Sequence, residues 1–245
     1  MSEIFKIKLA GKSIGISAMN CYVREYCRDY LIDGKADFDI AISPSDIEYE
    51  RERSEAEDKK EGIPVRHFTD SYLETLAVYR KIADKMLDYD TVLFHGSAVA
   101  VDGIGYLFTA KSGTGKSAHT RLWREMLGER AVMINDDKPL IKISKNGIMV
   151  YGTPWDGKHR LSTNTVVPLR SLCILERAED NHIVPITKKD AYPMLLQQVH
   201  RPTGADGMMK TLSLIDRLAD NIALYRLGCN MDISAAKTAY DGMKG

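Results

Sequence analysis

The segment YLFTAKSGTGKSA, residues 106–118, decides the fold of the second half of the chain. Tyr106–Thr109 has the apolar composition of a short buried strand, and Ser117–Met126 has the spacing of an amphipathic helix. The glycine-rich loop Ser112–Ser117 lies between them. A strand, a glycine-rich loop and a helix in this order place free backbone amides at a helix N-terminus, which is a binding site for phosphate groups.

Each residue type in the loop has a function in holding a nucleotide triphosphate. Gly113 and Gly115 let the backbone approach the phosphates, Lys116 reaches the β and γ phosphates, and the Ser117 hydroxyl can ligate magnesium. We therefore expect ATP and Mg²⁺ as cofactors. The residues expected to bind the nucleotide are Ser112, Gly113, Thr114, Gly115, Lys116, Ser117 and Ala118.

A pair of acids, Asp136-Asp137, follows the short apolar strand predicted over Ala131–Ile134. This strand could run beside the strand that enters the loop, which would bring the acids to the phosphates. One carboxylate would then hold the metal, and the other would accept the proton of an attacking hydroxyl. The alternative is an acidic turn that only opens the next hairpin.

The remainder of the second half favours a mixed, largely antiparallel sheet. Leu140–Ile143 and Ile148–Tyr151 flank an Asn-Gly turn, and Leu169–Glu176 and His182–Ile186 flank Asp180-Asn181 in the same manner. A doubly wound parallel sheet would alternate strands with helices here. We expect an α/β fold of the α+β kind, with a helical C-terminal cover over Ala191–Gln198, Thr211–Leu224 and Ile233–Met243.

The N-terminal part has the pattern of a β-rich section, residues 1–70. A highly charged stretch, Ser45–Gly62, interrupts it and predicts an exposed helix or a mobile loop. A helix is predicted over Tyr72–Leu87. Residues 71–245 would form the P-loop domain, unless the whole chain is one continuous domain. The predicted strands are Ile4–Leu9, Lys12–Ser17, Cys21–Tyr26, Asp37–Ile42 and Ile63–Phe68.

Composition limits the classes of partner. The chain has 245 residues, 34 basic and 34 acidic side chains and a hydrophobic fraction of 44%, so no net field favours nucleic acid or an anionic membrane. No segment approaches the ~20 apolar residues of a membrane span. The four cysteines form no C-x-x-C pair, which is typical of reduced thiols in a cytoplasmic protein. We expect no nucleic-acid and no membrane partner.

The motifs together resemble HPr kinase/phosphorylase. That family has a His-Gly, a G-x-x-G-x-G-K-S loop and a paired Asp, which correspond here to His95-Gly96, Ser112–Ser117 and Asp136-Asp137. The resemblance covers about Leu93–Ile143. It extends to the ATP-dependent phosphoenolpyruvate carboxykinases, which share a P-loop and a mixed sheet.

The resemblance implies functions for particular side chains. Ser117 and one of the aspartates, taken here as Asp137, would ligate magnesium, while the other aspartate would be the general base and His95 would lie near it. Lys116 would complete the catalytic set. The chain departs from the family at Ala110, where the first glycine of the loop is expected, and the family's second glycine-rich signature is not found downstream.

The segment Tyr151–Arg160 has the composition of a binding loop. Lys158 or Arg160 could neutralise a transferring phosphoryl group, and Trp155 or Asp156 could orient the acceptor. The alternative is a packed surface turn with solvated charges.

The sequence leaves several functions open. The first is a kinase that transfers the γ-phosphoryl group to a hydroxyl of a small molecule or of a serine in a peptide or protein. The second is a regulatory module that binds a nucleotide without transferring anything. The third is a carboxykinase-like lyase, which the short chain disfavours. A homo-oligomer is possible, and the sequence does not decide it.

Overall fold

A computed structural model describes residues 3–157 and 159–244 of the chain. The backbone forms two compact units, Met1–Lys85 and Met86–Gly245, which are described separately below. The long helix α3, Asp70–Met86, belongs to the first unit except for its last residue.

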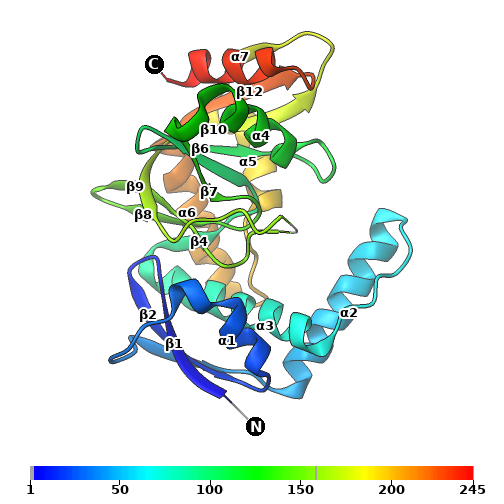
Figure 1. Cartoon of the computed structure of the whole chain (residues 1–245), viewed down its shortest axis with the longest axis vertical. Coiled ribbons are helices and arrows are strands. Elements are labelled where there is room, and N and C mark those ends of the chain that lie inside the picture. The colour runs from blue at the N-terminus through cyan, green and yellow to red at the C-terminus, as the bar shows by residue number, and fades with distance from the viewer. Residues whose placement is uncertain (1–2, 158, 245) are drawn as a thin grey trace. The chain divides into compact units, whose positions relative to one another are not determined.

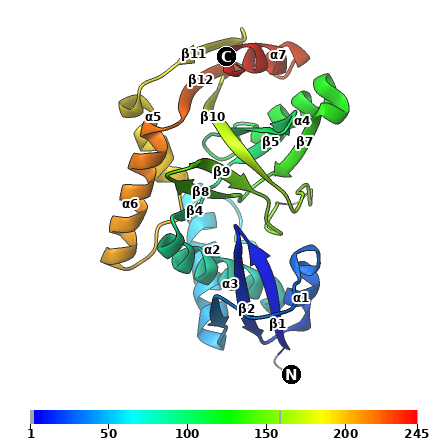
Figure 2. The ribbon, with the colours of Figure 1, turned by 90° about the vertical axis from the view of Figure 1, so that its left-hand side faces the viewer.

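The first unit is built on a three-stranded sheet, in which β1 and β2 form an antiparallel hairpin and β3 lies parallel to β2 (Figure 2). Ala10 and Gly11 turn the chain between β1 and β2, with φ angles of 46° and 79°. Positive φ at both central residues matches the right-handed twist of the strands on either side. The strand bounds are Glu3–Leu9 for β1, Lys12–Ala18 for β2 and Phe38–Ala41 for β3.

Helices account for most of the rest of this unit, and two of the predicted strands are wrong. Cys21–Tyr26 forms helix α1, and no strand is assigned within Ile63–Phe68. A run of this length is ambiguous between helix and strand, and only Val23 of α1 is buried. The charged stretch is helix α2, Pro44–Glu61, and the short segment Arg28–Tyr30 is a 3-10 helix.

Ion pairs join α2 to α3. Arg80 binds Glu50 at 2.5 Å, and Lys81 binds Asp46 at 2.7 Å. A capping box at Ser43 starts α2, and so the helix is stabilised by its cap and ion pairs rather than by an apolar face.

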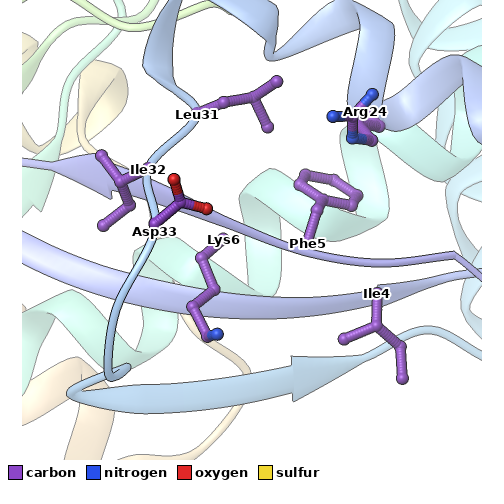
Figure 3. A pocket seen from close by; sticks show the side chains of 7 residues that line it. All are labelled: Ile4, Phe5, Lys6, Arg24, Leu31, Ile32 and Asp33. Atoms are coloured by element: carbon purple, nitrogen blue, oxygen red, sulfur yellow. The ribbon is translucent and has the colours of Figure 1, made fainter.

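A pocket of about 380 Å³ belongs to the first unit. Its lining combines four apolar with three charged side chains (Figure 3), namely Ile4, Phe5, Leu31 and Ile32 with Lys6, Arg24 and Asp33. It contains neither a glycine-rich loop nor a pair of acids.

The second unit is a mixed α/β fold on a nine-stranded sheet (Figure 1). The main strand order is β4-β8-β9-β10-β6-β5-β7, and β12 pairs with both β10 and β11. The bounds are Thr91–Leu93 for β4, Ser97–Val101 for β5, Ile104–Thr109 for β6, Ala131–Asn135 for β7, Leu140–Ser144 for β8, Gly147–Tyr151 for β9, Val166–Arg177 for β10, His182–Pro185 for β11 and Ala223–Cys229 for β12.

The long strand β10 explains why the sheet is mixed and curled. Its first residues pair antiparallel with β9, whereas the residues from Leu169 onward pair in parallel with β6 and those from Ser171 onward with β12. One strand therefore joins an antiparallel portion to a parallel one. The predicted mixed α/β class is confirmed.

Of the two predicted hairpins, one is confirmed and one is wrong. β8 and β9 pair antiparallel around Asn146-Gly147. β10 and β11 do not pair with each other, because β12 lies between them, parallel to β10 and antiparallel to β11. The helix predicted over Thr211–Leu224 ends at Asp220, and the chain after it enters the sheet as β12.

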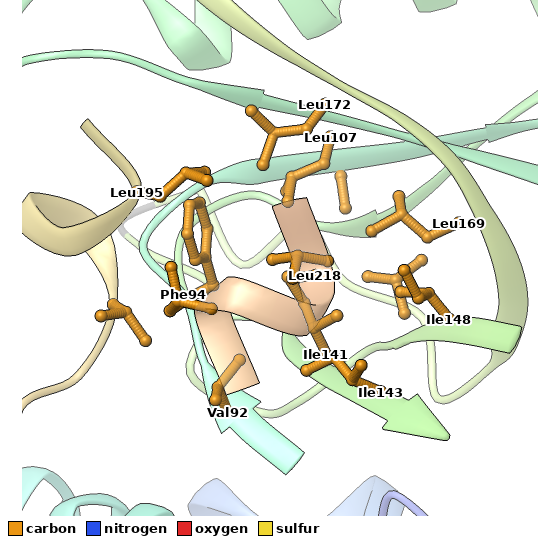
Figure 4. Packing of buried hydrophobic residues seen from close by; sticks show 14 of the residues in the cluster. Val92, Phe94, Leu107, Ile141, Ile143, Ile148, Leu169, Leu172, Leu195 and Leu218 are labelled. Carbon is orange, nitrogen blue, oxygen red and sulfur yellow. The ribbon is translucent and has the colours of Figure 1, made fainter. Parts of the chain in front are cut away.

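Helices cover both faces of this sheet. On β5, Ala98 and Ala100 belong to the core under α5 and α6, while Val99 and Val101 belong to the core under α4 and α7 (Figure 4 shows the first core). This alternation is the two-residue period of a strand buried on both faces. None of the helices within the described residues is long and apolar enough to cross a bilayer. The helix bounds are Lys116–Leu127 for α4, Lys188–Gln198 for α5, Ala205–Asp220 for α6 and Ile233–Met243 for α7, with 3-10 helices at Leu87–Tyr89 and Gly128–Arg130.

Candidate active site

The glycine-rich loop joins β6 to α4. Gly113 and Gly115 have φ angles of 73° and 119°, a region that favours glycine, and Gly115 is the residue that caps the start of α4. The loop therefore presents backbone amides at the N-terminus of a helix of three turns. Ser112, Gly113 and Ser117 are exposed, whereas Thr114, Gly115, Lys116 and Ala118 are partly buried.

Ala110 replaces the expected first glycine without backbone strain. Its φ angle is not positive, and its methyl group is fully buried in the core beneath α4 and α7. An alanine therefore fits at this position, and the departure from the motif leaves the strand–loop–helix geometry intact.

Sheet topology brings the acid pair to the same edge as the loop. β5 lies between β6 and β7 and runs antiparallel to both, so β7 is not the direct neighbour of the loop strand that the sequence suggested. Because β6 and β7 are each antiparallel to β5, they are parallel to each other. Their carboxyl ends, which carry the loop and Asp136-Asp137, consequently meet at the edge where β5 begins.

The first residue of β5 connects the two ends. Ser97 Oγ donates a hydrogen bond to Asp136 Oδ1 at 2.7 Å, and it lies 3.0 Å from Thr120 Oγ1 on α4. All three side chains are buried. Buried polar groups require partners, so this contact holds Asp136 in one position relative to the loop helix.

Asp137 has a different environment, at the rim of the site. His95 Nε2 lies 3.3 Å from Asp137 Oδ1, and Lys138 Nζ lies 3.8 Å from Oδ2. Burial acts to raise the pKa of the Asp137 carboxyl. The hydrogen bond from His95 and the charges of Lys138 and Lys116 outweigh burial, and this pKa is lower than usual.

Lys116 is close enough to both acids to interact with their charges. Burial lowers the pKa of its ammonium group, and the carboxylates of Asp137 and Asp136 act in the opposite direction without offsetting burial. Loop lysine, paired acids and His95 thus occupy one edge of the sheet.

Asn135 organises the chain around the acids. Its Oδ1 accepts from the backbone amides of Asp137 and Lys138 at 2.9 and 2.6 Å. Its Nδ2 donates to the carbonyl oxygens of Thr153 and Trp155 at 3.0 and 3.3 Å. One buried amide therefore shapes the acidic turn and ties the predicted binding loop to it.

Glycines permit this loop to pass close to the acids. A Cβ atom on Gly152 would lie 1.9 Å from the carbonyl oxygen of Thr163, so only glycine fits. A Cβ atom on Gly157 would lie 3.3 Å from Cβ of Asp137. The loop and Asp137 are therefore neighbours.

The four tentative substrate residues of the loop differ in accessibility. Trp155 is only 1% exposed, so its ring packs inside the protein. Asp156 is buried, accepts from Ser162 Oγ at 2.8 Å and lies 3.6 Å from Nε of the exposed Arg160. Burial raises the pKa of Asp156. Lys158 lies outside the described residues.

Three residues at this edge were missed as functional candidates: Ser97, Asn135 and Arg177. Ser97 and Asn135 stand beside residues that the motif singles out, so position next to the motif was an available signal. Arg177 ends β10 and donates from Nη2 to the carbonyl oxygen of Gly113 at 2.6 Å. No sequence pattern connects it to the loop, because the parallel pairing of β10 with β6 creates the contact.

Comparison with known proteins gives structural similarity without a sequence match. No family model matches the chain, and no curated protein matches it. A solved structure, the HPr(Ser) kinase/phosphatase from Coxiella burnetii, matches with 10% identity and a TM-score of 0.34, over 62% of this chain and 99% of that chain. The functional argument below rests on this chain's own residues.

Replacing Asn135 tests the organisation of the acidic turn. Asn135→Asp keeps the acceptor but loses the Nδ2 donor and places a negative charge beside two carbonyl oxygens. We expect the free energy of unfolding to fall by about 3 kcal/mol. Denaturant unfolding followed by tryptophan fluorescence measures it, because both tryptophans of the chain, Trp123 and Trp155, lie in the second unit. Asn146→Asp, in the exposed β8–β9 turn, is the control and should change little; equal effects would contradict the interpretation.

Removing His95 tests the electrostatics of the rim. His95→Ala eliminates the hydrogen bond and the positive charge that lower the pKa of Asp137, while burial remains. The pKa of Asp137 should therefore rise, as measured by a ¹³C NMR titration of its carboxyl carbon. His182→Ala, at an exposed position on β11, should leave it unchanged. An unchanged pKa in His95→Ala would show that His95 does not act on Asp137.

Proposed function

We propose that the protein is an ATP- and magnesium-dependent phosphotransferase that moves the γ-phosphoryl group of ATP to a hydroxyl. The observation that carries the proposal is the meeting, at one sheet edge, of a glycine-rich loop with its lysine and two carboxylates in different environments. Phosphoryl transfer requires mainly positioning and electrostatic stabilisation, and this edge supplies the groups for both.

The loop would hold the phosphates. Amides at the start of α4 and around Gly113 and Gly115 give fixed positive dipoles, and the Lys116 ammonium adds a full charge. Partial burial of Lys116 strengthens its attraction for an anion, because the local dielectric constant is lower than that of water.

Asp136 and Ser117 are suited to hold magnesium. Both offer oxygen donors, which Mg²⁺ prefers, and Ser117 lies exposed in the first turn of α4. Asp136 is 6% exposed, and among residues 3–157 and 159–244 no lysine, arginine or histidine forms an ion pair with it. A buried carboxylate of this kind needs a counter-charge. When bound, the metal would neutralise charge on the β and γ phosphates.

Asp137 is suited to be the base, which makes Asp136 rather than Asp137 our choice for the metal. The Asp137 side chain is 29% exposed, so an acceptor hydroxyl can reach it, and His95 orients its carboxylate. The hydroxyl oxygen bonds to the γ phosphorus, the bond from phosphorus to the bridging oxygen breaks, and ADP leaves. The hydroxyl proton passes to Asp137. A carboxylate with a lowered pKa suffices, because it mainly orients the hydroxyl.

The acceptor would approach from the side of the loop that contains Gly157. Arg160 is exposed there and can interact with a negatively charged group, while Asp156 is buried and holds Ser162. The acceptor class that fits is a hydroxyl on a small molecule or on a serine of a peptide.

Nucleotide binding is tested by thermal or denaturant unfolding with Mg²⁺ and ATP. ATP at 100 times its dissociation constant should stabilise the second unit by about 2.7 kcal/mol. Lys116→Ala should remove most of this gain, since it removes the charge that contacts the phosphates. Lys111→Ala, an exposed lysine just before the loop, should retain it. If the parent protein shows no stabilisation, the proposal is wrong.

Transfer is tested with labelled ATP and a pool of hydroxyl metabolites and serine peptides. Asp137→Asn should reduce labelling by about 10²–10⁴-fold while ATP binding persists, because only the base is lost. Asp136→Asn should also reduce labelling and should in addition weaken the magnesium dependence of binding. Asp180→Asn, at an exposed acid, is the control. If both site variants still transfer label at the parent rate, the roles proposed for Asp136 and Asp137 are wrong.

A further inference from the structure

A pocket of about 460 Å³ adjoins the loop on the side of β10 and β12, and nothing in the transfer step above uses it. Gly113, Thr114 and Gly115 form one wall. The other walls come from α4, from the end of β10 and from the segment that follows β12, elements that lie close together in Figure 1. The pocket is within the size range of small-molecule sites.

We propose that this pocket holds the base and ribose of the nucleotide whose phosphates lie on the loop. The inference rests on the proposed function. A ligand with its phosphates on the amides of Gly113–Gly115 has its remaining part next to them, and the pocket shares those residues. Leu122, Leu175 and Met231 give it apolar surface, which suits the faces of a flat heteroaromatic ring.

His119 gives the pocket wall a defined polar group. Trp123 Nε1 donates to His119 Nε2 at 3.1 Å, so Nε2 is unprotonated and the proton of the neutral ring is on Nδ1. Burial lowers the pKa of His119 to about 4, which keeps the ring neutral at physiological pH. Among the described residues, Nδ1 has no hydrogen-bond partner. Nδ1 is buried from solvent, so a ring nitrogen of a base or a ribose oxygen would accept from this N–H only if the pocket wall shifts as the nucleoside enters.

Arg177 joins the pocket to the loop. Its guanidinium donates to the carbonyl oxygen of Gly113 at 2.6 Å, and the residue also lines the pocket. A planar guanidinium can stack on an aromatic ring while its N–H groups remain engaged. Arg177 is therefore a positioning residue, since it fixes one end of the loop at the place where the ribose would meet the phosphates.

The test compares ATP with inorganic tripolyphosphate, each with Mg²⁺, by calorimetric titration. Tripolyphosphate has the phosphates without the nucleoside, so the parent should bind ATP at least about tenfold more tightly. Ala178→Phe, which fills the pocket, should remove this advantage and leave tripolyphosphate affinity within about twofold. Retained tripolyphosphate binding also shows that the variant is folded.

A smaller change in the pocket lining tests the same inference independently. Met231 is 60% exposed, so Met231→Ala carries little risk for folding, and it should weaken ATP binding about fivefold without affecting tripolyphosphate. Met209→Ala, at a 68% exposed methionine on α6 outside the pocket, should change neither affinity.

The outcomes separate this inference from the function on which it rests. Equal binding of ATP and tripolyphosphate by the parent, or an unchanged ATP advantage in Ala178→Phe, overturns the nucleoside pocket and leaves the phosphate loop standing. Binding of neither ligand overturns both.

Discussion

The hydroxyl group of Ser97 is the contact on which the arrangement of the site depends. β5 runs opposite to the strands on either side of it, so its first residue is next to the last residues of both. From there one buried oxygen contacts Thr120 on the loop helix and Asp136 on the acidic turn. All three side chains are shielded from water, so their polar atoms require hydrogen-bond partners within the protein. These contacts therefore fix the position of the loop helix relative to the acidic turn.

Two adjacent aspartates acquire opposite surroundings from this arrangement. Asp136 is buried and accepts a hydrogen bond from the Ser97 hydroxyl, whereas Asp137 lies near His95 and Lys138 and is partly exposed. Asn135 allows the two environments to differ, because its Oδ1 accepts from the amides of Asp137 and Lys138 and so stabilises a turn immediately after β7. Identical residue types can therefore serve different purposes one position apart.

Short sequence motifs predicted the elements whose conformation is determined by neighbouring residues in the chain. The glycine loop, the acid pair and the β8–β9 hairpin carry turn and cap residues that can be recognised within a short window. The placement of β12 and the contact of Arg177 with the loop depend on pairing between distant strands, which no short window contains. Helix α1 was mistaken for a strand because so short a segment, with Val23 as its buried residue, has no clear period.

The close approach of backbone atoms to Gly152 restricts which residues related sequences can have at this position. Any side chain at this position would collide with the carbonyl oxygen of Thr163. Gly152 therefore cannot be substituted while the loop keeps its path beside the acids. We therefore expect any chain whose loop takes this path, after an Asn-Asp-Asp turn and one hairpin, to have a glycine at the corresponding position.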